Sequence, residues 1–130
     1  MKKVQDSKVV TYRFRGTDYP LLFDLYAMEM IEDEFGSMKA AMLELTGGKQ
    51  FKALRKLFRI LANAAREAED LPEDVTGNEV RRAGAEEMRE LSDAIQQCFK
   101  AGKKTETEAG QEGSDERREL FEDEEDRKNG

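Results

Sequence analysis

The sequence predicts a mainly α-helical fold, in which a small N-terminal β-hairpin precedes about four amphipathic helices. Apolar residues recur every three or four positions from Leu25 to Phe99, whereas period-two alternation is confined to the first strand. Apolar content falls sharply after Gly102. We therefore expect a flexible N-terminus over residues 1–8, one mostly helical domain over residues 9–102, and a disordered acidic tail over residues 103–130.

The hairpin is predicted over residues 9–23. Val10, Tyr12 and Phe14 alternate with polar residues, which is typical of a half-buried strand. The RGTD stretch then offers a turn, and YPLLF offers a second extended piece. Pro20 has no backbone N–H, which suits an edge strand but not a helix interior.

Two short helices are predicted next. Asp24 can cap the first helix, whose apolar stripe should consist of Leu25, Met28, Ile31 and Phe35. Gly36 can end it by adopting a left-handed conformation. Ser37 should begin the second helix, which the Gly47-Gly48 pair should end; its inward side chains are Met38, Ala41, Met42 and Leu45.

The third helix has the clearest pattern, over residues 51–68. Its predicted buried stripe consists of Phe51, Leu54, Leu57, Phe58, Leu61, Ala64, Ala65 and Ala68. The positions between are basic, and no acid interrupts them before Glu67: Lys49, Lys52, Arg55, Lys56, Arg59 and Arg66. This basic stripe could be a plain solvent-exposed face, a contact for an acidic surface on another subunit or on this chain's own tail, or a phosphate-binding face.

The fourth helix follows the loop EDLPEDVTGN. Thr76 and Glu79 have the spacing of a capping box at its start, and Gly102 could cap its end. The expected stripe is Val80, Gly84, Met88, Leu91, Ile95 and Phe99.

Charge and cysteine content exclude several classes of protein. The net charge is −7, and the tail carries 11 acids against 6 bases, which argues against a general nucleic-acid-binding protein. A single cysteine, Cys98, cannot form an internal disulfide and fits a reducing cytoplasm. No apolar run suggests a membrane span, and the N-terminus lacks the pattern of a signal peptide, so we expect a protein that is not secreted.

The acidic stretch MEMIEDEFG is the first place to look for chemistry. Glu29, Glu32 and Asp33 would share one flank of a helix, and Glu34 follows. Helical carboxylate metal sites usually recruit histidine, and the chain contains none. We therefore interpret the cluster as a solvent-exposed flank, or as a contact for a basic partner.

The remaining candidates are also non-catalytic. Cys98 has no histidine or second cysteine to activate it, so we expect a small buried residue beside Phe99. Because no phosphate loop or dinucleotide fingerprint occurs, we expect no enzyme, no metal, no cofactor and no small-molecule substrate. Flexible methionines can coat adaptable binding surfaces, although the core is the default location for most of them. The predicted partner-binding residues are Met28, Met30, Met38, Met42, Lys52, Arg55, Lys56 and Arg59.

The order of these features resembles the tail assembly chaperones of long-tailed bacteriophages and prophages. The resemblance rests on Tyr19-Pro20-Leu21-Leu22-Phe23 and on Ala27 through Ser37, which follow the family pattern of a "Y-P-L-x-F" piece leading into an "A-x-x-x-I-E-x-x-F-G-S" helix. It extends over roughly residues 9–102 and includes no catalytic residue.

The resemblance implies a small helical protein of the host cytoplasm that binds the tape measure protein, keeps it soluble during tail assembly and is absent from the mature virion. It also implies a longer form made by ribosomal frameshifting near the C-terminus. We expect the methionines to contact the client and the basic helix to support a homo-oligomer. The alternative is a helical regulatory or adaptor protein that binds a protein target through its acidic tail.

Overall fold

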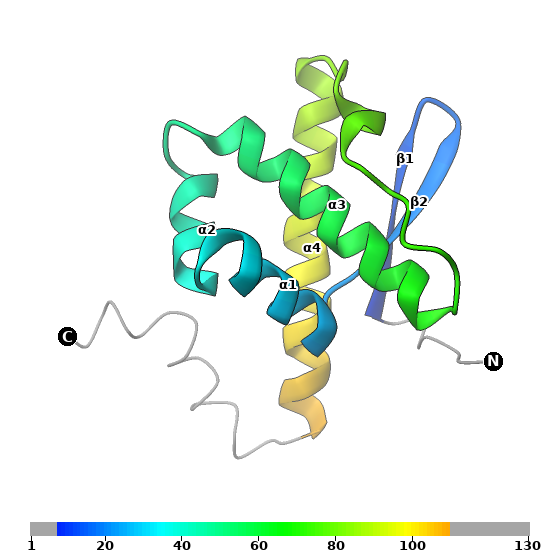
Figure 1. The fold of residues 1–130 in the computed structure, drawn as a ribbon, viewed down its shortest axis with the longest axis vertical. Helices are drawn as coiled ribbons and strands as arrows, with labels where there is room; N and C mark the ends of the chain where they lie inside the picture. Colours follow the sequence, from blue (N-terminus) through cyan, green and yellow to red (C-terminus); the bar gives the residue numbers. More distant parts are fainter. Residues whose placement is uncertain (1–7, 110–130) are drawn as a thin grey trace.

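The structure, a computed structural model, describes residues 8–109 and confirms the predicted fold class (Figure 1). Residues 1–7 and 110–130, which include most of the predicted acidic tail, lie outside the described residues. The elements are β1 (Val9–Phe14), β2 (Thr17–Leu22), α1 (Leu25–Phe35), α2 (Met38–Leu45), α3 (Gln50–Ala68), the 3₁₀ turn η2 (Asn78–Val80) and α4 (Ala85–Ala109).

The two strands form the predicted antiparallel hairpin. Its two-residue turn has positive φ at both positions, 51° at Arg15 and 88° at Gly16. This geometry matches the natural twist of the strands, and glycine adopts it without steric cost. The register pairs Tyr12 with Tyr19 and Thr11 with Pro20.

Side-chain caps separate α1 from α2 as predicted. Asp24 Oδ1 accepts a hydrogen bond from the Ala27 amide at 3.0 Å, and Ser37 Oγ accepts one from the Ala40 amide at 2.9 Å. Gly36 ends α1 with a φ of 96°, and its amide donates to the Glu32 carbonyl. Each cap satisfies a backbone group that a helix end leaves unpaired.

Helix α3 is the centre of the core. It crosses α4, and it contacts β2, α1 and α2 as well (Figure 1). The rings of Tyr12 and Tyr19 meet Phe58 edge-on, with centroids 6.1 and 5.1 Å away. The buried positions fill more than one stripe: Ala53, Leu54, Leu57, Phe58, Ile60, Leu61, Ala62, Asn63, Ala64 and Ala65.

The loop after α3 covers the flank that a simple stripe would leave exposed. Asn63 donates from Nδ2 to the Val75 carbonyl at 2.9 Å and accepts from the Val75 amide at 3.0 Å. Arg66 Nε donates to the Pro72 carbonyl, and Val75 is buried. The loop therefore buries Asn63, which the sequence pattern did not identify.

Helix α4 begins and ends later than predicted. Glu79 accepts a hydrogen bond from the Thr76 amide, which is one half of the predicted capping box, but the Thr76 hydroxyl accepts from the Asn78 amide rather than from the Glu79 amide. These contacts lie at η2, whose N-cap is Gly77, and α4 starts only at Ala85. Gly102 does not end the helix, since α4 continues to Ala109. Gly102 is buried instead, because the Phe23 backbone passes so closely that a Cβ atom would lie 2.5 Å from its carbonyl oxygen.

Gly84, which precedes α4, and two large apolar residues of the predicted stripes lie at the surface. Leu25 is 67% exposed and Phe51 is 65% exposed. Both stand in the first turn of their helices, beyond the elements that cover the later turns. In α1 the fully buried side chains are Ala27 and Ile31, whereas Met28 and Phe35 are half-buried.

Replacing Gly102 with Ala should destabilise the protein, although alanine normally favours a helix interior. The new methyl group would collide with Phe23, and overpacking of this kind costs about 1–3 kcal/mol. Urea denaturation monitored by circular dichroism measures the change. Gly48→Ala, where the added methyl group meets no atom within 4 Å, is the control and should leave the midpoint nearly unchanged.

Replacing Asn63 with Leu should lower the free energy of unfolding by about 1–3 kcal/mol, because both polar groups of Val75 lose their partner. Hydrogen exchange of the Val75 amide should accelerate more than the exchange of the other buried amides does. An exchange rate that rises only in proportion to global stability would contradict this role of Asn63.

Candidate functional site

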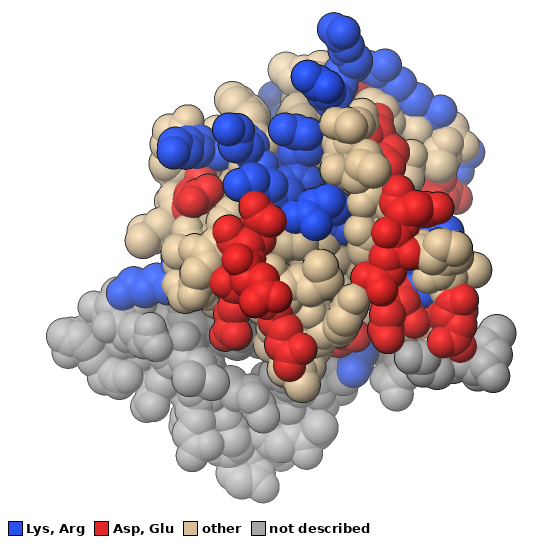
Figure 2. Space-filling view, viewed as in Figure 1, with Lys and Arg blue, Asp and Glu red and all other residues tan. Residues whose placement is uncertain are grey.

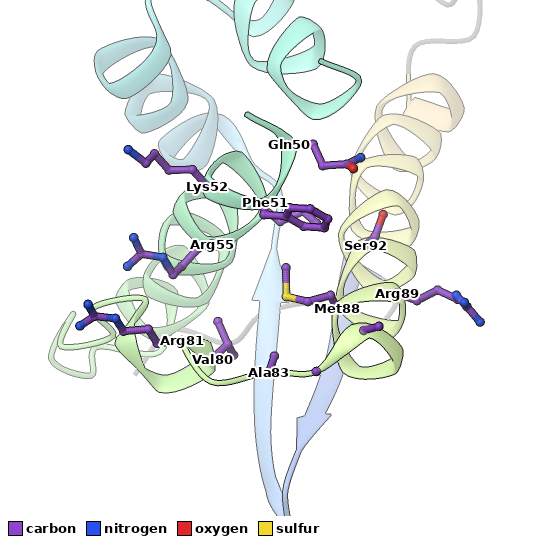
Figure 3. Close-up of a pocket in the computed structure, with 13 residues that line it drawn as sticks. Gln50, Phe51, Lys52, Arg55, Val80, Arg81, Ala83, Met88, Arg89 and Ser92 are labelled. Atoms are coloured by element: carbon purple, nitrogen blue, oxygen red, sulfur yellow. The ribbon is translucent and has the colours of Figure 1, made fainter. Parts of the chain in front are cut away.

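The candidate site is a groove of about 780 Å³ between the start of α3 and the start of α4 (Figure 3). Gln50 to Arg55 form one side, and Ala85 to Ser92 form the other. The segment from Val80 to Gly84 closes one end. A concave site of this size is large enough to hold several side chains of a partner.

The interior of the groove is apolar. Leu54 and Val80 are buried beneath it, and Phe51 and Met88 extend toward each other across it (Figure 3). Met88 is half-buried, whereas Phe51 leaves most of its ring in solvent. An exposed aromatic ring beside a flexible thioether is typical of an adaptable protein-binding surface.

The rim of the groove is basic. Lys52, Arg55 and Arg81 follow one another along one side, and Arg89 extends from the other side (Figure 3). Arg89 pairs with Glu86 at 3.3 Å in an exposed contact, whereas Lys52, Arg55 and Arg81 form no ion pair with another described side chain. Figure 2 shows basic side chains gathered over the upper part of one face, above two acidic groups.

The segment from Thr76 to Glu79 packs against α3 beside Arg55, on the basic rim of the groove. Gly77 has a φ of 93°, and a Cβ atom there would lie 3.3 Å from Arg55 Cγ, so glycine allows the loop to approach α3. Glu79 accepts hydrogen bonds from the amides of Thr76 and Gly77. Although partial burial opposes the effect, these bonds lower the pKa of Glu79.

The hairpin fixes the start of α4. Arg15 Nε and Nη2 donate to the two carboxylate oxygens of Glu87 at 2.8 and 2.9 Å, and Nη2 also donates to the Arg82 carbonyl. Glu87 accepts the Gly84 amide as well, at 2.8 Å. The Arg15 hydrogen bonds, followed by the Gly84 amide, lower the pKa of Glu87 to about 2.

A second, smaller cavity of about 380 Å³ continues the groove along α4. Gln50, Leu54 and Ser92 line both spaces, so the two are contiguous. Met42, Leu45 and Phe99 add apolar surface to the second cavity. The combined groove follows α4 from its first turn to Phe99.

The structure divides the predicted basic contacts into two groups. Lys52 and Arg55 lie on the rim of the groove. Lys56 and Arg59 instead pair with Glu34 of α1, at 3.1 and 3.0 Å. These two cations are therefore already matched within the chain, and the acidic and basic helices contact each other in the same molecule.

The predicted methionine surface is also divided. Met28, Met30 and Met38 are half-buried and pack against the core, and they line neither cavity. Met42 alone among the four lines the second cavity. Met30, which the helical pattern placed off the main stripe, still packs against the core.

The carboxylates of α1 and the thiol of Cys98 were the sequence candidates for a metal site or a nucleophile. Glu29, Glu32 and Asp33 are exposed, as expected for a solvated flank. Within the described part of the chain, no three potential metal ligands come together. Cys98 is fully buried, and burial followed by the Asp24 charge raises the pKa of its thiol to about 12, which disfavours the thiolate.

The groove residues that sequence reasoning missed include Phe51, Arg81, Met88 and Arg89. Phe51 and Met88 fitted the apolar stripes, so a helical pattern alone assigned them to the core. The consecutive bases Arg81-Arg82 directly after Val80 were the available signal for the rim.

The site can bind an amphipathic segment of another protein or of this chain, with apolar side chains in the groove and acids on the rim. In the described residues, no helix has the length and apolarity that crossing a membrane requires. Comparison with protein-family models, curated proteins and solved structures gives no match for this chain.

The ion pair at the start of α4 should make stability depend on pH. Since folding lowers the pKa of Glu87 to about 2, its contribution is complete above the ordinary glutamate pKa, about 4.3, and is lost as the pH falls toward the folded value. The difference in unfolding free energy between the natural protein and Glu87→Gln should therefore shrink from pH 6 to about pH 2.

Urea denaturation across this pH range measures the difference. Glu86→Gln is the control, because Glu86 is exposed and its pair with Arg89 contributes little. A Glu87→Gln difference that stays constant across the range would show that the Arg15 contact does not stabilise the fold.

Proposed function

We propose that this protein is a non-catalytic tail assembly chaperone of a long-tailed phage or prophage. It binds the tape measure protein through the groove between α3 and α4 and keeps this client soluble while the tail is built. On this proposal it acts in the host cytoplasm and is absent from the mature virion.

The observation that carries the proposal is the exposed ring of Phe51 above an apolar groove. A phenylalanine that is 65% exposed, next to Met88 and above Leu54, is unfavourable in water and becomes favourable when a partner covers it. A holdase stabilises its client by binding energy alone, so it needs such a surface and no catalytic group.

The shape of the groove suits a helical client. The two contiguous cavities follow α4, so a second helix could lie along them with side chains at every third or fourth position directed inward. The tape measure protein, as the family resemblance describes it, is long and helical and offers many such segments.

The residues that carry the resemblance have structural roles. Leu21, Leu22 and Phe23 are buried, and Gly36 forms the cap between α1 and α2. The family-like motif therefore supports the fold, whereas the proposed binding residues lie elsewhere. This moves the client contact from the methionines of α1 and α2 to the groove, where Met42 and Met88 remain.

Co-expression with fragments of the tape measure protein tests the proposal. The natural protein should increase the soluble fraction of a fragment, and Phe51→Gln should remove most of this increase, because the groove loses its aromatic contact. Leu43→Gln is the matched control, since Leu43 is 62% exposed and lies outside both cavities.

Client solubility that is equal with and without the natural protein would refute the chaperone function. If the Phe51 and Leu43 variants lose the same share of the increase in client solubility, the groove is not the client-binding site. Thermal unfolding of each variant establishes that both remain folded.

A further inference from the structure

We propose that residues 119–126 of this chain bind in the groove of the same molecule. The segment reads ELFEDEED and lies outside the described residues. Leu120 and Phe121 would cover Phe51 and Met88, while the acids would face the basic rim. The chain would thereby carry its own occupant for the binding groove.

Charge complementarity is the first argument. Residues 119–126 contain six acids and no base. Lys52, Arg55 and Arg81 stand in one row along the rim, with their charged ends directed away from the interior of the groove (Figure 3) and without ion-pair partners among the described side chains. Three unmatched cations beside an apolar groove attract an acidic segment more strongly than a neutral one.

The position of the apolar residues is the second argument. After Gly102, Leu120 and Phe121 are the only large apolar side chains, and acids follow them without interruption to Asp126. The segment thus complements the groove. Its apolar pair matches the apolar interior, and its acids match the basic rim.

The length of the chain permits binding within one molecule. Along α4, Ala109 is about 26 Å from Ser92 at the middle of the groove and about 32 Å from Met88, at 1.5 Å per residue. The eleven residues from Ala109 to Leu120 extend up to about 36 Å. The segment can therefore reach the whole groove from the end of the helix.

Binding within the molecule would be favoured by a high effective concentration, since the segment is tethered to the helix that lines the groove. If the proposed function holds, the tail competes with the client and keeps Phe51 covered until a client displaces it. The binding of the tail itself requires no assumption about the client.

Paramagnetic relaxation in the protein of residues 1–130 tests the proposal. A nitroxide label at Arg118→Cys lies two residues before Leu120, and the buried thiol of Cys98 will not react with the reagent. The methyl signal of Met88, in a protein with labelled methionine methyl groups, reports on the groove. We expect this signal to lose most of its intensity in the oxidised sample and to recover when the label is reduced.

Charge-reversed variants provide the controls. In Lys52→Glu/Arg81→Glu, two exposed rim cations are reversed, and the Met88 signal should recover. In Lys39→Glu, an exposed cation of α2 outside both cavities is reversed, and the signal should remain weak. Sodium chloride at 1 M, which reduces the screening length to about 3 Å, should also restore the signal.

A mixture of labelled-methyl protein without nitroxide and nitroxide protein without labelled methyls identifies the molecule that supplies the tail. Loss of the Met88 signal in this mixture would overturn binding within one molecule and assign the tail to a second copy. A full-strength Met88 signal in the single-molecule sample would overturn the proposal. Since no client is present, neither result depends on the chaperone function.

Discussion

Burial of the middle turns of α3 is the constraint on which the rest of the fold depends. Its middle turns place Leu57, Phe58 and Leu61 out of contact with water. Four of its buried residues are alanines, and their small side chains allow neighbouring elements to approach closely. The hairpin, the two short helices, the following loop and α4 all pack against this one helix, so each element is stabilised by the same surface.

The groove results from the way α4 is attached. The hairpin holds its start through the Arg15–Glu87 pair and the Tyr12 hydroxyl, which donates to the Glu87 carbonyl at 3.1 Å. Further along, Phe23 packs against Gly102 and meets the ring of Phe99 edge-on. These contacts fix α4 against the hairpin, while the elements beside the first turn of α3 leave the ring of Phe51 mostly uncovered.

The basic side chains of the domain fall into two groups, those paired within the chain and those on the rim of the groove. Glu34 already balances Lys56 and Arg59 inside the chain, so these cations stabilise the contact between α1 and α3. Lys52, Arg55 and Arg81 have no such partner among the described side chains and stand next to apolar surface. Cations in that position would favour an acidic occupant, and the apolar interior would favour apolar side chains on it. An acidic amphipathic segment satisfies both requirements.

Local sequence determined much of this fold, because caps, turns and short-range periodicity depend on neighbouring residues. Asp24, Ser37 and Gly36 act as their residue types predict, and so do the strand alternation and most of the α3 stripe. The tertiary structure decided which apolar residues are covered. Asn63 is buried by a loop from twelve residues away, Gly102 is enclosed by Phe23, and Phe51 continues a stripe but stays mostly exposed. Burial depends on elements distant in the chain, so the groove could not be recognised from helical spacing alone.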